Sequence, residues 1–283
     1  MNCVPFAGAS FGADITDVDL SAVRDSVFSA IYAAWLERAV LRIRGQSLDD
    51  DALMRFARLF GPLEYRPMGW ITREEREKAA NPYLATISNI VVDGRPIGGL
   101  GDAEAAWHTD MSYIEHPPTA SILHALEVPE EGGSTHFCNM IGALQSLPPD
   151  LARRVRGARL KHDAAHDSVG TLRRGHHDVD DPRDAPGACH PMVLRHPETG
   201  IDALYLGRRQ DAYVEGLPLE ESEAFLDTVW RYVALEGDVW TQEWEVGDVL
   251  VWDNRSVMHR RAAFDPTARR LMRRAQVRST NQA

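Results

Sequence analysis

The stretch WHTDMSY, residues 107–113, places a histidine and a carboxylate two positions apart. Residues i and i+2 of an extended strand point to the same face, so a strand here sets His108 and Asp110 side by side without a turn. Trp107 before the pair and Tyr113 after it supply the apolar flanks that a strand needs. An imidazole beside a carboxylate becomes a metal site when a third ligand arrives from another part of the chain.

The best candidate for that third ligand is His259. The stretch GDVLVWDN, residues 247–254, predicts a turn and a buried strand, and His259 follows it closely. Two histidines and one carboxylate on one face leave three coordination positions open, an arrangement used by Fe(II) enzymes that activate dioxygen. We therefore predict that His108, Asp110 and His259 are the catalytic metal ligands of a non-haem iron oxygenase.

A second cluster of the same kind, HDVD at residues 177–180, shows how weak a lone His-x-Asp signal is. It lies in a run from 173 to 184 that is rich in charged residues and broken by glycine and proline. Such a composition is typical of a loop and lacks the apolar flanks of a strand. The pair that begins at His108 is the better half-site, and the role of His176 and His177 stays open.

Length and charge limit the domain organisation and the partners. The 283 residues, of which 44% are hydrophobic, can bury one substantial core, and we expect a single domain spanning 1–283. The formal net charge of −11 argues against general binding of nucleic acid or of anionic membranes. We expect neither among the partners, while a homo-oligomer stays open because the apolar helices leave room for one.

Cysteine usage and the first residues bear on the compartment. Cys3, Cys138 and Cys189 are odd in number and widely spaced, which fits reduced thiols better than a disulfide framework. The first basic residue is Arg24, so the sequence lacks the positively charged start of a signal peptide. No apolar run approaches the length of a membrane span. We therefore expect a soluble cytoplasmic protein.

Hydrophobic periodicity predicts helices near the start and in one late block, with many short strands between them. The longer expected helices span 21–35, 49–60 and 219–233, and Ser47 begins a stretch with capping-box spacing before the second of them. A further short helix is expected to open at 148–150, with proline at its start. Residues from about 163 to 190 are polar and irregular, which is typical of a long functional loop. This order predicts a mainly β fold with α additions: a jelly-roll core (double-stranded β-helix, cupin-like) with flanking helices.

Seven arginines follow His259, and for most of them the surface of a solvated strand is the simplest interpretation. Arg270 and Arg274 share parity along a strand and so face the same side. If that side is the barrel interior, each guanidinium needs an anionic partner, since an unpaired buried charge is very costly. A carboxylate is the natural bidentate match. The site would then hold a keto-acid co-substrate and an acidic substrate.

These motifs resemble the taurine dioxygenase and aryloxyacetate dioxygenase family of Fe(II)/alpha-ketoglutarate-dependent oxygenases. The resemblance covers nearly the whole chain, from about 12 to 278. WHTD at 107–110 matches the first half of the family's iron site, and GGST at 132–135 resembles its Gly-Gly-Asp-Thr motif. VWDNR at 251–255, together with His259, matches the distal segment.

The resemblance implies Fe(II) on the three predicted ligands, with alpha-ketoglutarate as co-substrate. Thr135 would contact the keto acid, and Arg270, at the family's interval after His259, would bind its far carboxylate. Arg274 falls where relatives place an arginine near the substrate anion. The implied reaction is hydroxylation, or desaturation or epoxidation, with release of succinate and CO2. Halogenation is excluded, because Asp110 fills the position that halogenases leave to chloride.

Substrate identity is the least readable feature. Where the family commonly has Asn, four residues before His108, this chain has Glu104, and its role stays open. A specificity loop is expected at about 65–83, where Arg66 either meets a substrate anion or is plain surface and Trp70 packs against an apolar body. Ser112 is a further candidate substrate contact.

A lid or insertion is expected at about 162–190. Three alternatives stay open beside a catabolic aryloxyacid or sulfonate dioxygenase. The chain could tailor an acidic natural-product intermediate, hold zinc as a hydrolase, or be a non-catalytic jelly-roll protein that binds metal and keto acid. The pairing of Thr135 with Arg270 argues against the hydrolase, which has no need to hold a keto acid.

Overall fold

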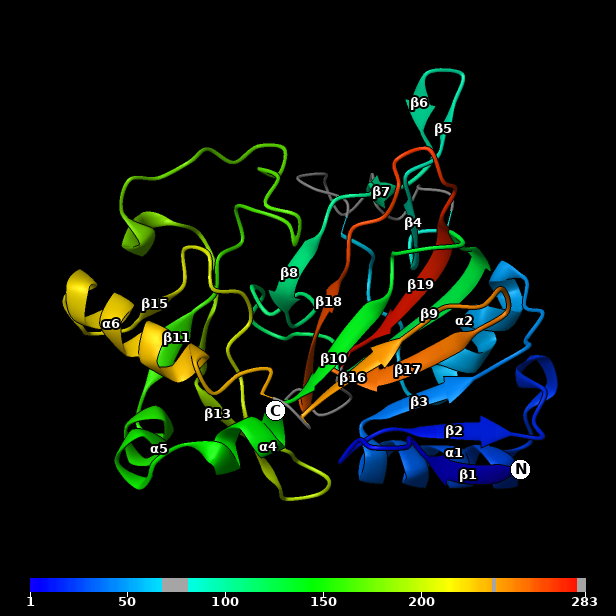
Figure 1. Ribbon diagram of the computed structural model, residues 1–283, viewed down its shortest axis with the longest axis horizontal. Coiled ribbons are helices and arrows are strands. Elements are labelled where there is room, and N and C mark those ends of the chain that lie inside the picture. Colours follow the sequence, from blue (N-terminus) through cyan, green and yellow to red (C-terminus); the bar gives the residue numbers. More distant parts are fainter. Residues whose placement is uncertain (68–80, 236–237, 279–283) are drawn as a thin grey trace.

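Two β-sheets face each other across a shared apolar interior in the computed structural model, which describes residues 1–67, 81–235 and 238–278 (Figure 1). The larger sheet has eight strands in the order β1-β2-β3-β17-β9-β19-β4-β7, and the smaller has four in the order β16-β10-β18-β8. Neighbouring strands are far apart in sequence and pair mostly antiparallel. The predicted mainly β jelly-roll fold is confirmed.

The strands of the larger sheet are β1 (Asn2–Pro5), β2 (Ala13–Thr16), β3 (Val40–Ile43), β17 (Val249–Asp253), β9 (Ala120–Glu127), β19 (Leu271–Val277), β4 (Leu84–Ser88) and β7 (Gly99–Leu100). Those of the smaller sheet are β16 (Val239–Gln242), β10 (Thr135–Asn139), β18 (Val257–Arg261) and β8 (Ala105–His108). A short hairpin of β5 (Val91–Val92) and β6 (Arg95–Pro96) projects from the barrel (Figure 1).

Alternation along strand β17 shows how the sequence builds two apolar layers. Val249 and Val251 pack into the cluster that includes helices α1 (Asp25–Arg38) and α2 (Asp50–Leu59). Leu250 and Trp252 point the other way, into the interior between the two sheets. Period-two alternation in a strand gives one residue set to each face. The helices therefore cover the outer face of the larger sheet and leave the inner face for the site.

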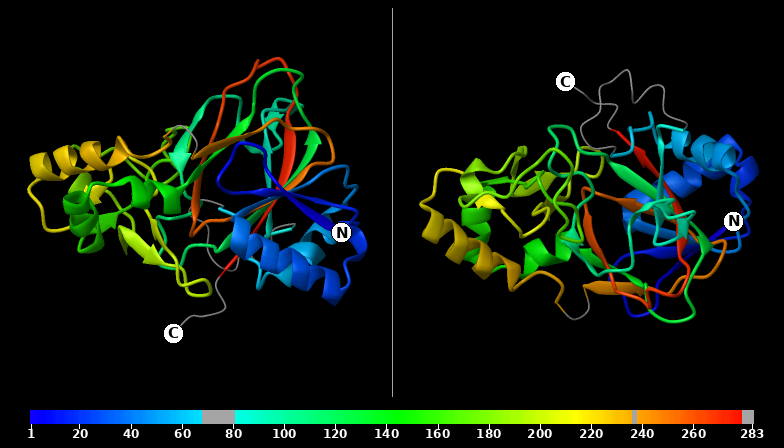
Figure 2. Two further views of the ribbon diagram at one scale, coloured as in Figure 1. Left: turned by 60° about the horizontal axis from the view of Figure 1, so that its bottom comes forward. Right: turned by 90° about the horizontal axis from the view of Figure 1, so that it is seen from above.

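A second lobe packs beside the barrel (Figures 1 and 2). Its α-helices are α4 (Met140–Ser146), α5 (Pro149–Arg156) and α6 (Leu219–Trp230), and it also carries the short 3-10 helix η2 (Pro182–Asp184). A second 3-10 helix, η1 (Leu20–Ala22), precedes α1. Its strands are β11 (Arg159–Lys161), β12 (Cys189–Pro191), β13 (Val193–Arg195), β14 (Asp202–Leu204) and β15 (Tyr213–Val214). The lobe has its own apolar cluster and carries the segment from 162 to 190 to the mouth of the barrel.

Three local expectations need correction. The strand of the His-x-Asp motif ends at His108, and Asp110 lies in the turn that follows. Helix α2 is capped by Asp49, whose side chain accepts a hydrogen bond from the Ala52 amide, and not by Ser47. Helix α4 was not expected, because its seven residues are too few for a clear helical period. No helix in the described ranges is long and apolar enough to cross a bilayer.

The cap of α2 gives the first prediction. Replacing Asp49 by Ala removes the acceptor for an otherwise unpaired amide at the helix start, and should lower the free energy of unfolding by about 1 kcal/mol. Urea unfolding measures the change. Ser47→Ala is the matched control and should have little effect, because Ser47 is exposed. A larger loss in the Ser47 variant would contradict the assignment of the cap.

Candidate active site

Strand pairing brings the two predicted histidine ligands together. His259 on β18 lies opposite His108 at the end of β8, and their ring centroids are 4.2 Å apart. Phe137 and Trp252 pack against the His259 ring, at centroid distances of 5.8 and 4.9 Å. Opposite positions of an antiparallel pair are the closest neighbours across a sheet. The register of β8 and β18 thus sets how close the two histidine rings lie.

Asp110 reaches the histidines from the turn after β8. Its Oδ1 lies 3.8 Å from His108 Nε2 and accepts a hydrogen bond from Arg274 Nη1 at 2.8 Å. Its Oδ2 accepts one from Ser121 Oγ, also at 2.8 Å. Met111 adopts a positive φ of 49°, which turns the chain away directly after the carboxylate. Both carboxylate oxygens are held in place by side chains from the larger sheet.

The electrostatics give the ionisation states that a metal site needs. Burial and the neighbouring His259 lower the pKa of His108 to about 3, and burial lowers the pKa of His259 to about 4. Burial raises the pKa of Asp110, but the positive charge of Arg274 and the two histidines outweigh it and bring that pKa to about 2. At neutral pH the cluster presents two neutral imidazoles and one carboxylate, which are the ligating forms.

The three side chains fit a metal ion. One ligand atom from each lies within 4.8 Å of the others, and all three residues are buried. His108 Nδ1 donates to the Ala106 carbonyl at 2.7 Å, which leaves the lone pair of Nε2 toward the cluster. This is the usual orienting contact of a metal-bound imidazole. His259 Nδ1 is buried and has no hydrogen-bond partner in the part of the chain that the structure describes.

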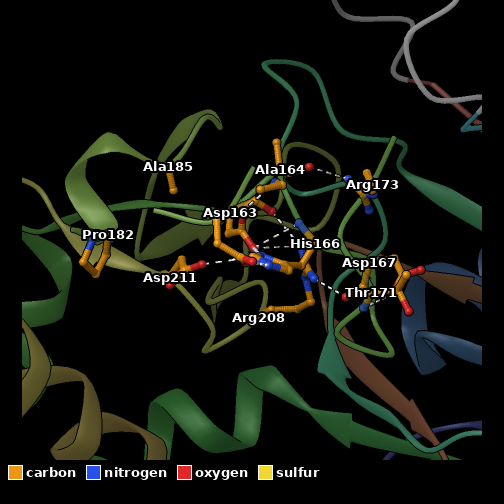
Figure 3. Close-up of polar contacts among 12 residues, drawn as sticks. Asp163, Ala164, His166, Asp167, Thr171, Arg173, Pro182, Ala185, Arg208 and Asp211 are labelled. Atoms are coloured by element: carbon orange, nitrogen blue, oxygen red, sulfur yellow. Dashed lines mark hydrogen bonds and ion pairs between the residues drawn. The ribbon is translucent and has the colours of Figure 1, made fainter. Parts of the chain in front are cut away.

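A second group with suitable ligand types, Asp163, His166 and Asp211, fits a metal less well (Figure 3). His166 Nδ1 lies 2.9 Å from Asp163 Oδ2, and its Nε2 lies 3.0 Å from Asp178 Oδ1. An imidazole between two carboxylates is protonated on both nitrogens and has no lone pair to offer. Arg208 is also 3.7 Å from Asp163. We interpret this group as an imidazolium cluster, in which the Asp178 of the predicted HDVD loop takes part.

The two residues predicted to hold the keto acid lie on the inner side of the barrel. Thr135 begins β10, and its Oγ1 accepts a hydrogen bond from Trp244 Nε1 at 2.9 Å, so its own hydroxyl hydrogen is free to donate. Arg270 precedes β19 and packs against Phe264, whose ring centroid is 6.0 Å from its guanidinium carbon. A Cβ placed on Gly133 would lie 3.6 Å from Arg270 Cδ, so the GGST turn borders the arginine.

The buried charge of Arg270 has no anionic partner among the described residues. Only 2% of the residue is exposed, and its side chain makes no hydrogen bond or ion pair with residues in the described ranges. Burial and the like charge of Arg261 lower the pKa of Arg270 to about 9, which still leaves it charged at neutral pH. A buried cation with no partner is costly unless a ligand supplies the anion. The pocket at Arg270 is therefore suited to a carboxylate.

The structure places the four candidate substrate residues differently. Arg66 lines the cavity next to the histidine pair, but Trp70 lies outside the described residues, as do positions 68–80 of the predicted specificity loop. Arg274 lines the same cavity, yet it donates to Asp110. Ser112 is 3% exposed and faces Gly207 and not the cavity.

Glu104, at the position where the family commonly has Asn, does not line the cavity beside His108. Its carboxylate pairs with Arg260 at 2.5 Å on the outer side of β18, and it lines a different cavity from His108. A keto-acid contact is therefore not supported by this conformation.

The cavity beside the metal ligands has a volume of about 410 Å³ and contains residues that sequence reasoning missed. Arg173 and Arg208 reach its wall from the second lobe, and Tyr113 lies beneath Arg173. Ser121 and Trp244, which orient Asp110 and Thr135, were also missed. No local sequence pattern signals these contacts, since each joins residues distant in the chain.

The imidazolium cluster gives a prediction on pH. Burial lowers the pKa of His166, but hydrogen bonds to Asp163 and Asp178 outweigh it and raise that pKa above the ordinary 6.5. The stabilisation is complete below the unfolded pKa and is lost as pH rises through the folded one. His166→Gln should therefore lower the free energy of unfolding more at pH 6 than at pH 9, measured by urea unfolding. His177→Gln, at an exposed position, is the control, and an equal loss at both pH values would contradict the cluster.

Comparison with known proteins agrees with this geometry. The family model described as "Taurine catabolism dioxygenase TauD, TfdA family" matches residues 4–276. The alpha-ketoglutarate-dependent 2,4-dichlorophenoxyacetate dioxygenase of Cupriavidus pinatubonensis is 35% identical over 94% of this chain and 93% of its own. Pentalenolactone F synthase of Streptomyces arenae is 29% identical over 96% of this chain and 94% of its own.

The structural comparison reaches the same family. A crystal structure of a taurine dioxygenase from Burkholderia xenovorans superposes with a TM-score of 0.76 at 28% identity, over 98% of this chain and 89% of that one. The family model and the sequence relatives each span nearly all of the chain. The chain belongs to the TauD, TfdA family of alpha-ketoglutarate-dependent dioxygenases.

Proposed function

We propose that this chain binds Fe(II) and alpha-ketoglutarate and oxidises a small carboxylate-bearing molecule, releasing succinate and CO2. The observation that carries the proposal is the buried, unpaired Arg270 behind a cluster of two neutral histidines and an ionised aspartate. The cluster accounts for a metal and the arginine for a dicarboxylate. A zinc hydrolase would need the first and not the second.

The residues present would divide the work as follows. His108, Asp110 and His259 would hold the iron, and Arg270 with the Thr135 hydroxyl would hold the far carboxylate of the keto acid. Bound together, Fe(II) and alpha-ketoglutarate supply the oxidation of a substrate C–H bond, coupled to decarboxylation of the keto acid. The protein contributes position and shielding from water.

Arg274 and Ser121 act on the carboxylate ligand. Their hydrogen bonds to the two oxygens of Asp110 keep that group ionised and fix its orientation. Such orienting contacts commonly change metal affinity by about 10- to 100-fold when removed. We therefore assign Arg274 first to Asp110, and not to the substrate.

The substrate is proposed to enter through the 410 Å³ cavity, with residues 162–190 as a lid over one catalytic domain. The relatives' names point in two directions. One is a 2,4-dichlorophenoxyacetate dioxygenase, and the other a pentalenolactone F synthase. Both degradation of an aryloxyacid and tailoring of an acidic natural product fit the basic cavity, and hydroxylation, desaturation and epoxidation all fit the cluster.

Loss of a ligand tests the metal assignment. His108→Ala or Asp110→Ala should abolish succinate release in the presence of Fe(II), alpha-ketoglutarate and a responsive acid, because two ligands do not hold iron facially. His116→Ala, at an exposed position outside the cavity, is the control and should keep the wild-type rate. Substrate-dependent succinate release by either ligand variant would refute the proposal.

Arg270 gives a prediction on co-substrate affinity. Arg270→Gln removes the charge that faces the far carboxylate and should raise the KM for alpha-ketoglutarate by about 10- to 100-fold, as expected for a lost charged hydrogen bond. The neighbouring Arg269 is the matched control, because it is exposed and paired with Glu127. An unchanged KM in Arg270→Gln together with a raised KM in Arg269→Gln would show that the keto acid binds elsewhere.

A further inference from the structure

The cavity beside the metal ligands is strongly basic for a protein of net charge −11. Five arginines line it, against two aspartates, Asp110 and Asp167. The arginines are Arg66, Arg173, Arg174, Arg208 and Arg274. They differ in whether a carboxylate of the protein lies beside the guanidinium group.

Two of the five are engaged by the protein itself. Arg274 donates to Asp110 at 2.8 Å. Arg208 is 7% exposed, and it donates to the carbonyls of Asp163, at 2.6 Å, and Asp167. Its guanidinium also lies 3.7 Å from the Asp163 carboxylate. A carboxylate of the protein therefore already lies beside each of these two guanidinium groups, at Asp110 for Arg274 and at Asp163 for Arg208.

The other three, Arg66, Arg173 and Arg174, pair with no carboxylate within the described ranges. Arginines elsewhere in this acidic chain commonly do, as in Arg42–Asp14, Arg209–Glu223, Arg255–Asp253 and Arg269–Glu127. Three unpaired like charges around one cavity repel one another. A ligand anion between them would remove that repulsion.

Arg173 is held ready for such a contact. Its amide donates to the Ala165 carbonyl at 2.7 Å and its Nη1 to the Ala164 carbonyl at 3.1 Å. Its guanidinium carbon lies 3.9 Å from the ring centroid of Tyr113, so the planar group rests on an aromatic face. These contacts fix its position, and among the residues that the structure describes the guanidinium donates only through Nη1, to Ala164 (Figure 3). Pre-organised donors bind an anion with little loss of side-chain entropy.

The imidazolium cluster fixes the backbone that carries Arg173. Asp163 accepts hydrogen bonds from the amides of Ala165, at 2.6 Å, and His166, at 3.3 Å, as well as from the His166 ring. Arg208 joins this carboxylate to the Asp167 carbonyl (Figure 3). The segment is thus ordered by charge and not by regular secondary structure.

Arg66 and Arg173 also lie where two cavities adjoin. Both line the 410 Å³ cavity and the neighbouring one of about 820 Å³, together with Pro67, Met111 and Tyr113. The second cavity contains neither His108 nor Asp110. An anion between Arg66 and Arg173 would sit where the two spaces meet, with the body of the molecule free to extend toward the metal ligands.

We infer that Arg173 and Arg66 bind the anionic group of the substrate at this junction, in place of Arg274. The inference rests on the proposed function for the identity of the ligand as substrate. Arg174, which is exposed, adds to the positive field. The ligand class is an organic carboxylate, or a sulfonate or phosphate of similar geometry, whose charged end is remote from the carbon that reacts.

Calorimetric titration of the metal-free protein with phenoxyacetate and with neutral phenoxyacetamide tests the site. Wild type should bind the acid more tightly than the amide. Arg173→Gln and Arg66→Gln should each weaken the acid by about 10- to 100-fold and leave the amide unchanged, because each removes one charged hydrogen-bond donor group. Two variants on separate segments guard against misfolding of one, and thermal unfolding checks the fold of both.

One matched variant completes the design. Arg183→Gln alters an exposed arginine of the same segment that pairs with Asp181, and should keep the preference for the acid. The inference is overturned if wild type shows no preference, or if Arg274→Gln loses the preference while Arg173→Gln and Arg66→Gln retain it. The titration contains no iron, so failure of succinate release would refute the proposed function and leave this result standing.

Discussion

The interior of this barrel depends on how buried guanidinium groups are neutralised. Arg270 and Arg274 both lie on the inner side of the sheet and are 2% and 8% exposed. A buried charge without a partner is costly, and among the described residues Arg274 has such a partner in Asp110 whereas Arg270 has none. Arg274 orients the Asp110 carboxylate, one of the three proposed metal ligands. Arg270 leaves a requirement that an alpha-ketoglutarate carboxylate would meet.

The arginines that line the 410 Å³ cavity also differ in whether they have an anionic partner. Arg208 donates hydrogen bonds to carbonyls of the second lobe. Arg66 and Arg173 line the same cavity and pair with no carboxylate in the described ranges. In the proposed function the barrel would provide the metal and keto-acid ligands, and the segment from 162 to 190 would provide contacts to the substrate. This division would place the substrate contacts on a long loop and the metal ligands on or directly beside two paired strands.

The family and the candidate metal ligands could be predicted from the sequence, but the side chains that orient those ligands could not. His108, Asp110 and His259 were predicted from an i, i+2 pair and a downstream histidine, and the structure brings the three together, although Asp110 lies in the turn after β8 and not in the strand. Parity alone suggested that Arg270 and Arg274 face inward, but it could not show that Arg274 would be captured by Asp110. Helix α4 is too short to leave a clear helical period, and the order around His166 depends also on Asp178 and Arg208, which no local pattern connects to it.

The most direct test of the account is anaerobic addition of Fe(II) and alpha-ketoglutarate to the purified protein. A chelate at the cluster gives a weak visible charge-transfer absorption, and a responsive acid perturbs it. The account predicts this absorption in wild type and in Arg269→Gln, and its loss in Arg270→Gln at the same keto-acid concentration. A folded wild-type protein without the absorption would contradict the metal and keto-acid assignment.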